Sequence, residues 1–294
     1  MVGRTISHYR ILAKLGEGGM GSVYKAHDQK LDRDVALKFI IGGFSRDDDK
    51  KRFIREAQAA ASLQHPNICP IYEVDEFQGR IFFVMAFLEG KTLAELIEEG
   101  ALPIEQAVSV ARQVAAGLEE AHDQGIIHRD IKSSNIVVNS KGRAILLDFG
   151  LAQRAGQSRL TATGAAMGTA PYMSPEQAQG ELTDAQTDLW SLGVVLYEAL
   201  AGQLPFESPH HLATLYSIIN EPPPRRSPNI DQRFRQTLRA WSSAPLRRTR
   251  RSAIRPPRKS WRTWEANRPI NRRSLGHGWY RWRRLMIPEV DRSG

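Results

Sequence analysis

Three segments near the start of the chain, at residues 9–15, 23–26 and 34–40, are strand-like. In the third, apolar and polar side chains alternate, and this period of two predicts a strand. Along the third segment it places Val35, Leu37 and Phe39 on one face and Ala36 and Lys38 on the other. A lysine on the buried face of a strand needs an anion, because an unpaired ammonium is costly to desolvate. The pattern therefore predicts a strand that presents Lys38 to negative charge.

Other segments repeat apolar side chains every three or four residues, which predicts helices. Helices are expected over residues 47–63, over 103–124, from Asp188 onward and over 208–219. Gly125 is expected to end the second of these. The stripe that carries this prediction consists of Ile104, Ala107, Val108, Ala111, Val114, Ala115, Leu118 and Ala121.

Residues 128–150, HRDIKSSNIVVNSKGRAILLDFG, bring together an acid, a cation, an amide and a second acid. The four residues are Asp130, Lys132, Asn135 and Asp148. Phosphoryl transfer from a Mg-nucleotide needs an acid that accepts the proton of the attacking hydroxyl. It also needs an amide and a second acid that hold metal against the phosphates. The ordered set resembles the catalytic loop and the metal-binding motif of the protein kinases.

An upstream segment, residues 16–23, has the pattern G-x-G-x-x-G-x-V through Gly16, Gly18 and Gly21. A dinucleotide fold would need these glycines to lead from a strand into a helix. Both flanks are strand-like instead, so a hairpin over phosphates is expected. Glycine lets backbone N–H groups approach phosphate oxygens without a Cβ in the way.

The resemblance implies an α+β, two-lobed protein-kinase-like fold over residues 9–224, lacking the last helices of the large lobe. It divides this domain into a small lobe (9–85), a hinge (86–90) and a large lobe (91–224). It also implies that Lys38 grips the α- and β-phosphates and is held by Glu56 of the 47–63 helix.

Further roles are implied by the resemblance alone. Asp188 is expected to anchor the backbone of the catalytic loop. Met85 is the expected gatekeeper, and the Ala86 carbonyl and Leu88 amide are expected to meet the adenine edge. The expected nucleotide-binding residues are Leu15, Gly16, Gly18, Gly21, Val23, Ala36, Lys38, Met85, Ala86, Leu88, Val137 and Asp148, and the expected metal ligands are Asn135 and Asp148.

Lys132, two residues after the catalytic aspartate, is typical of serine/threonine kinases, and the form EGGMG is typical of the bacterial, Hanks-type branch. The resemblance places Thr169 near Asp130. Thr161 and Thr163 are the candidate phosphorylation sites, and Arg129 is a cation for a phosphate there. The implied function is ATP-dependent transfer to Ser/Thr hydroxyls of proteins with Mg²⁺, or Mn²⁺ as the alternative metal, and self-association for autophosphorylation in trans.

Charge divides the chain in two. Residues 225–294 carry 20 basic and 4 acidic side chains, whereas residues 1–224 carry 21 and 28, so the net charge of +9 comes from the tail. Three hypotheses compete for this Arg- and Trp-rich tail: a nucleic-acid-binding arm, a membrane-surface arm and an out-of-frame translation. The third is favoured, because the family leads one to expect two helices there and an arginine that pairs with Glu176.

Cys69 is the only cysteine, so the chain has no internal disulfide. No apolar run of about 18 residues is present, so we expect no membrane span and a cytoplasmic location. A pseudokinase-like binding scaffold is the rival from another functional class.

Overall fold

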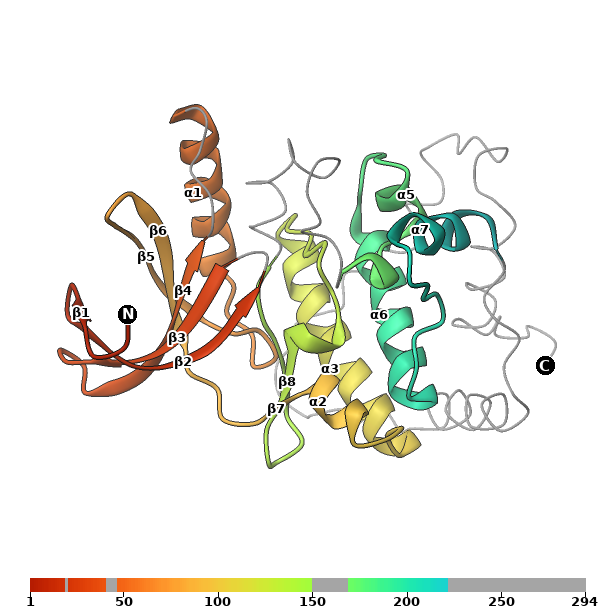
Figure 1. Cartoon of the computed structure of the whole chain (residues 1–294), viewed down its shortest axis with the longest axis horizontal. Coiled ribbons are helices and arrows are strands. Elements are labelled where there is room, and N and C mark those ends of the chain that lie inside the picture. Colours follow the sequence, from red (N-terminus) through yellow and green to blue (C-terminus); the bar gives the residue numbers. More distant parts are fainter. Residues whose placement is uncertain (19–20, 41–46, 150–168, 222–294) are drawn as a thin grey trace, which may run out of the picture. The chain divides into compact units, whose positions relative to one another are not determined.

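The computed structural model describes residues 1–18, 21–40, 47–149 and 169–221 (Figure 1). Met1–Asn220 form one compact unit, and this unit is described below. The candidate phosphorylation sites Thr161 and Thr163 and the 225–294 tail lie outside the described residues.

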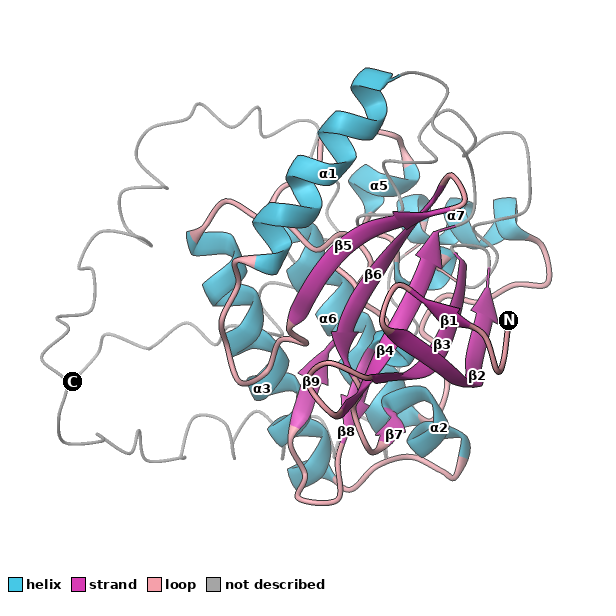
Figure 2. Ribbon diagram, turned by 90° about the vertical axis from the view of Figure 1, so that its left-hand side faces the viewer, coloured by secondary structure: helices cyan, strands magenta, loops and turns pink. Residues whose placement is uncertain are grey.

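The first part of the unit is an antiparallel sheet in the order β1-β2-β3-β4-β6-β5 (Figure 2). Its strands are β1 (Thr5–Ile6), β2 (Tyr9–Gly18), β3 (Gly21–Asp28), β4 (Arg33–Ile40), β5 (Ile71–Phe77) and β6 (Arg80–Ala86). The predicted strands at 9–15, 23–26 and 34–40 are confirmed. The edge strands β1 and β5 were not predicted, because β5 is mostly half-exposed and lacks a clear alternation.

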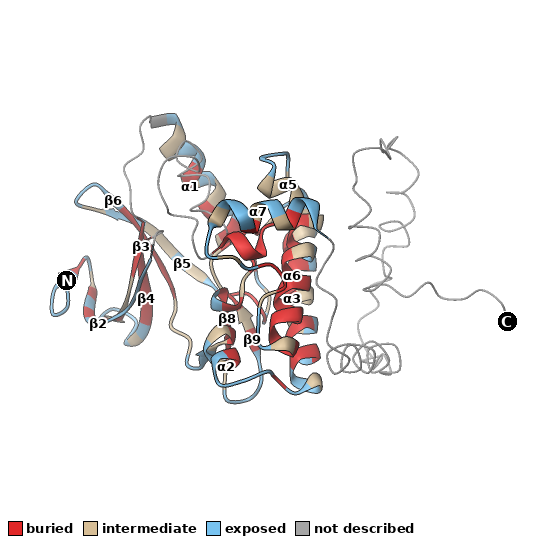
Figure 3. Cartoon of the chain, turned by 45° about the vertical axis from the view of Figure 1, so that its right-hand side comes forward, coloured by how far each residue is buried: buried red, intermediate tan, exposed pale blue. Residues whose placement is uncertain are grey.

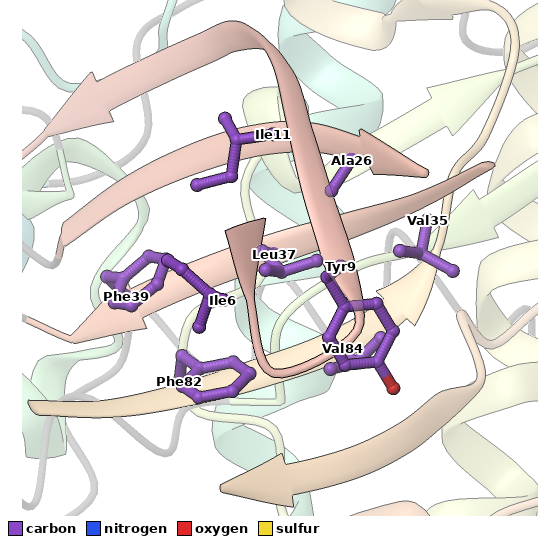
Figure 4. Packing of buried hydrophobic residues seen from close by; sticks show 9 residues of the cluster. All are labelled: Ile6, Tyr9, Ile11, Ala26, Val35, Leu37, Phe39, Phe82 and Val84. Atoms are coloured by element: carbon purple, nitrogen blue, oxygen red, sulfur yellow. The ribbon is translucent and has the colours of Figure 1, made fainter. Parts of the chain in front are cut away.

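Strand β4 is buried on both faces. Val35, Leu37 and Phe39 pack in one core cluster with Phe82 and Val84 of β6 (Figure 4). This confirms the predicted face.

The opposite face of β4 contributes Ala36 to a second cluster. Helix α1 (Asp47–Ala61) supplies Phe53 and Ala57 to this cluster, so α1 covers that face of the sheet. Lys38 points the same way by the pleat and is only 8% exposed.

A second, small sheet contains β7 (Lys91–Thr92), β8 (Ile136–Val138) and β9 (Ala144–Leu146). The chain segment after α1 is tied to it. Ile68 bridges Leu146, and the Asn67 side chain donates to the Ala144 carbonyl at 2.7 Å. The first sheet is thus connected to the part of the chain that carries the catalytic motif.

The second part of the unit is helical, with α2 (Leu93–Glu98), α3 (Ile104–Asp123), α5 (Pro175–Ala178), α6 (Ala185–Ala201) and α7 (His211–Asn220). This part also contains two short 3₁₀ turns, η1 (Ser133–Asn135) and η2 (Ala170–Tyr172). Helix α6 is buried along most of its length and packs against α3 (Figure 3).

Capping explains where α6 begins and ends. The Asp184 side chain accepts the Gln186 N–H at 2.8 Å, and Gly202 ends the helix in the left-handed conformation. The predicted helix over 103–124 is confirmed as α3. The predicted 208–219 helix begins later, at His211, because Ser208 and His210 form the turn before it.

Candidate active site

Asp188 holds the catalytic loop, residues 128–135, from the first turn of α6. Its fully buried carboxylate accepts the backbone N–H of His128 at 2.8 Å and that of Arg129 at 2.7 Å. The ring of His122 adds a third contact at 2.7 Å. The predicted anchoring role of Asp188 is therefore confirmed.

Asp130, the predicted catalytic base, is 3% exposed and held from two sides. The Asn135 amide donates to its backbone oxygen at 2.9 Å and to its Oδ2 at 3.0 Å. Lys132 Nζ lies 3.0 Å from Asp130 Oδ2 and donates to Thr169 Oγ1, also at 3.0 Å. The structure therefore brings Asp130, Lys132 and Asn135 together and places Thr169 beside them, as predicted.

His128 joins this loop to the residues before Asp148. Its Nδ1 accepts the Asp130 N–H at 3.2 Å, and its Nε2 lies 2.7 Å from the Leu147 carbonyl. The ring must therefore carry its proton on Nε2, where it can donate to that carbonyl. The ring also packs against Phe149, with centroids 4.7 Å apart. Through these contacts His128 fixes the spacing between Asp130 and Asp148.

Lys38 forms an ion pair with Asp148, with 2.7 Å between Nζ and Oδ2. The predicted need of Lys38 for an anion is met by this contact between β4 and the second acid of the motif. Glu56 is half-buried on α1, on the side of the sheet that Lys38 faces. Its pairing with Lys38 stays a prediction.

Gly21 stands where a side chain would collide with the neighbouring strand. A Cβ there would lie 1.8 Å from the carbonyl oxygen of Phe39, and φ is 148°. A Cβ at Gly16 or Gly18 would meet no described atom within 4 Å. The open backbone at these two positions is compatible with the expected approach of phosphate.

Most of the predicted adenine-binding residues share one apolar cluster. Ala36 and Met85 are buried in it, and Val23, Ala86 and Leu88 pack against it. The register of the sheet pairs Ala36 with Met85, and Val137 pairs with Ile145, which also packs against the cluster. Leu15 is not part of this cluster and is 49% exposed on β2.

The cysteine of the chain belongs to this cluster. Cys69 is buried, and its Sγ is 3.7 Å from the Ala86 carbonyl oxygen. Burial, followed by the negative charge of Asp148, raises the pKa of the Cys69 thiol to about 12. The thiol is therefore neutral at physiological pH.

Asn135 and Asp148, the predicted metal ligands, carry side-chain oxygen atoms of the kind that Mg²⁺ prefers. Both amide hydrogens of Asn135 are directed at Asp130, so its amide oxygen is the atom that can bind a cation. In the described part of the chain, no three His, Cys, Asp or Glu side chains cluster as a metal site. A cation here would take its remaining ligands from phosphates and water, as Mg²⁺ commonly does.

Several site residues were missed by sequence analysis. Gln177 donates to the Arg129 carbonyl at 2.9 Å and forms a capping box with Ser174. The Ser-x-x-Gln spacing was the signal that could have marked this cap. Ser133, Tyr172 and Glu198 form a buried polar junction that no local pattern marks.

Comparison with known proteins agrees with this geometry. The protein kinase domain family model matches residues 9–250. A Clostridium perfringens protein named as a probable serine/threonine-protein kinase is 42% identical over 243 residues, which cover 81% of this chain and 35% of that protein. The serine/threonine-protein kinase PrkC of Bacillus subtilis is 38% identical over 255 residues, which cover 84% of this chain and 39% of PrkC.

A solved structure is also similar. A cysteine-to-alanine mutant of the Mycobacterium tuberculosis PknI kinase domain superposes with a TM-score of 0.60 at 25% identity, covering 80% of this chain and 98% of that domain. The chain therefore belongs to the protein kinase family, in the bacterial serine/threonine branch, and has the two-lobed kinase fold.

The two bacterial relatives are much longer than the region they share with this chain. The chain spans little more than a third of the length of each. Among the described residues, no helix is long and apolar enough to cross a bilayer.

Proposed function

We propose that the chain transfers the γ-phosphoryl group of ATP to serine and threonine hydroxyls of protein substrates. The observation that carries this proposal is the position of Lys132 Nζ, 3.0 Å from both Asp130 Oδ2 and Thr169 Oγ1. One cation thus lies between the predicted base and the segment that resembles the substrate-binding end of the activation segment. This is where charge on a transferring phosphoryl group would need neutralising.

Asp130 orients the acceptor hydroxyl and takes its proton as the oxygen attacks the γ-phosphorus. The bond between that phosphorus and the bridging oxygen to the β-phosphate breaks, and ADP leaves. Lys132 stabilises the charge on the transferring group. Lys38, after leaving Asp148, binds the α- and β-phosphates, with Glu56 as its proposed support.

Asn135 and Asp148 would hold the divalent metal, which neutralises phosphate charge when bound. The glycines at 16, 18 and 21 would let backbone N–H groups approach the phosphates. Val23, Ala36 and Val137 would enclose the adenine ring, Met85 would limit the depth of its site, and the Ala86 carbonyl and Leu88 amide would meet its edge.

The decisive experiment replaces the base. Asp130→Asn should abolish nearly all transfer to a Ser/Thr peptide while nucleotide binding stays within about twofold, because Asp130 acts on the acceptor. Asp123→Asn, at the exposed end of α3, is the matched control and should leave the rate unchanged. Equal transfer by Asp130→Asn and wild type would refute the assignment. Nucleotide binding by wild type without any transfer would favour the pseudokinase-like scaffold.

We also propose that the activity is regulated by autophosphorylation at Thr161 and Thr163, carried out in trans between two copies. Arg129 is the proposed cation for the phosphate, and its Nε now donates to Thr183 Oγ1 at 3.0 Å. Mass spectrometry of protein incubated with ATP and Mg²⁺ should find phosphate on these threonines. Phosphate confined to residues outside 153–169 would contradict the proposal.

A further inference from the structure

Three buried oxygen-bearing side chains meet at the catalytic loop. Ser133 of η1, Tyr172 of η2 and Glu198 of α6 are 1%, 7% and 9% exposed. Ser133 Oγ lies 2.9 Å from Tyr172 Oη and 3.3 Å from Glu198 Oε1. Tyr172 Oη lies 2.8 Å from Glu198 Oε2. The three side chains thus form a closed triangle of hydrogen-bonding distances.

The number of available hydrogens favours a protonated Glu198. Each hydroxyl contributes one hydrogen, and an ionised carboxylate contributes none. Two hydrogens cannot fill three contacts, so one pair of oxygens would face each other without a proton. A protonated Glu198 supplies the third hydrogen. Glu198 can then donate to Ser133, Ser133 to Tyr172 and Tyr172 back to Glu198.

The surroundings of Glu198 also disfavour a charge. Within the described residues, the titratable groups that act on it are Tyr172 of η2 and Glu207 beyond the end of α6. No basic side chain of the described part, including α2, α3 and α7, forms an ion pair with it. Burial, reinforced by the Glu207 charge, raises the pKa of the Glu198 carboxyl despite its hydrogen bonds.

The triangle lies next to the catalytic residues on both sides. Ser133 follows Lys132 directly in the chain and precedes Asn135 by two residues. Tyr172 follows Thr169, the partner of Lys132, by three residues. The triangle is therefore a second connection between the catalytic loop and the segment that contains Thr169 and Tyr172. The first connection is the contact between Lys132 and Thr169.

We propose that Glu198 is a positioning residue whose protonated carboxyl closes a hydrogen-bonded ring between the catalytic loop and the segment that receives the protein substrate. Ionisation of Glu198 opens this ring, and the junction loosens. The consequence rests on the proposed kinase function: binding of the protein substrate weakens as pH rises, more than the rate of the chemical step does.

The variant Glu198→Gln tests whether the neutral form of Glu198 is the one that holds the ring. The glutamine amide can donate to Ser133 and accept from Tyr172 at any pH, as the protonated acid does. We expect the KM of wild type for a Ser/Thr peptide to rise at least threefold between the lowest pH at which both proteins stay folded and pH 9, relative to the Gln variant measured beside it. The KM for ATP should not diverge between the two proteins. Glu181→Gln, at an exposed site after α5, should follow the wild type.

If the peptide KM of wild type and that of Glu198→Gln changed with pH in the same way, the proposal would be overturned. A Gln variant whose peptide KM at the lowest pH of the series is tenfold or more above that of the wild type would also overturn it. That result would mean an ionised Glu198 that contacts a basic side chain of the substrate. If Glu198→Gln does not fold, Tyr172→Phe opens the ring instead. It should raise the peptide KM at the lowest pH of the series to the wild-type value at pH 9, and an unchanged KM would refute the ring.

A readout without activity separates this proposal from the proposed function. A carboxyl whose pKa is raised by folding contributes stability that is full below the unfolded-state value, about 4.3, and that is lost as pH rises through the folded-state value. The Tm of wild type should therefore fall over this window relative to that of Glu198→Gln. An equal dependence of Tm on pH in the two proteins would refute the ring even if the chain transferred no phosphate at all.

Discussion

Asp188 accepts the backbone N–H of Arg129 at 2.7 Å, and Arg129 has a φ of 66°, in the left-handed region. A non-glycine residue in this region costs about 1–2 kcal/mol. The carboxylate of Asp188 opposes that cost through a buried charged hydrogen bond. The conformation of the catalytic loop thus depends on a residue 59 positions away in the chain.

Asp188→Asn should therefore weaken both folding and activity. The amide that replaces one carboxylate oxygen would face the N–H donors of the loop, and a broken buried network costs about 2–4 kcal/mol. We expect the Tm to fall by about 5–10 °C and kcat to fall at least tenfold. Calorimetry and steady-state kinetics would measure both. Asp184→Asn is the control on the same helix and should be nearly neutral, because Asn caps a helix as well as Asp.

Lys38→Met should lower kcat/KM by about 10²-fold or more, because it removes the charge that orients the phosphates. Glu56→Gln should do less, since Glu56 is predicted to support that contact and not to make it. Lys25→Met removes a partly exposed ion pair with Asp34 in the same sheet and should have little effect. A larger loss from Glu56→Gln than from Lys38→Met would contradict the predicted order of roles.

Gly21→Ala should destabilise the protein, because its Cβ would lie 1.8 Å from the Phe39 carbonyl oxygen and β4 would have to shift. Overpacking of this kind costs about 1–3 kcal/mol. The same shift would displace Lys38, so the KM for ATP should rise as well. Thermal unfolding and ATP titration would measure the effects. Gly16→Ala has open space around its Cβ and should retain the Tm of wild type; equal Tm losses would count against the steric argument.

Cys69 should resist alkylation in the native protein. Its pKa of about 12 leaves about 10³-fold less thiolate at pH 8 than an ordinary thiol has. The rate of reaction with iodoacetamide should increase with pH across the alkaline range, since the raised pKa delays formation of the thiolate. Mass spectrometry reports the reaction directly, because the chain has one cysteine. Native protein that reacts at pH 8 as fast as urea-unfolded protein would contradict the assigned burial.

The residues of the kinase motifs and the long helix α3 were predictable because their signals are local. A fixed spacing marks Asp130, Lys132 and Asn135, and a regular apolar stripe marks α3. Contacts between distant segments carry no such signal. That Asp148 is the anion paired with Lys38 is decided by packing between β4 and the loop, 110 residues apart in the chain.

The junction of Ser133, Tyr172 and Glu198 was missed for the same reason. Glu198 belongs to a helix that is otherwise mostly apolar, and its partners lie 26 and 65 positions earlier in the chain. A buried acid in such a helix is unusual, but the sequence of the helix does not indicate which hydroxyl groups the acid contacts. The character of the 225–294 tail also remains a prediction, since it lies outside the described residues.

The burial of β4 on both faces restricts how this kinase domain can vary. Every side chain from residue 35 to residue 40 is buried, and all of them except Lys38 belong to one of two separate clusters. A strand with one solvent-exposed face tolerates substitution at every second position. Strand β4 has no solvent-exposed position from Val35 onward. In a random mutant library, substitutions should therefore accumulate in the edge strand β5, which has no fully buried position, and be depleted along the strand that carries Lys38.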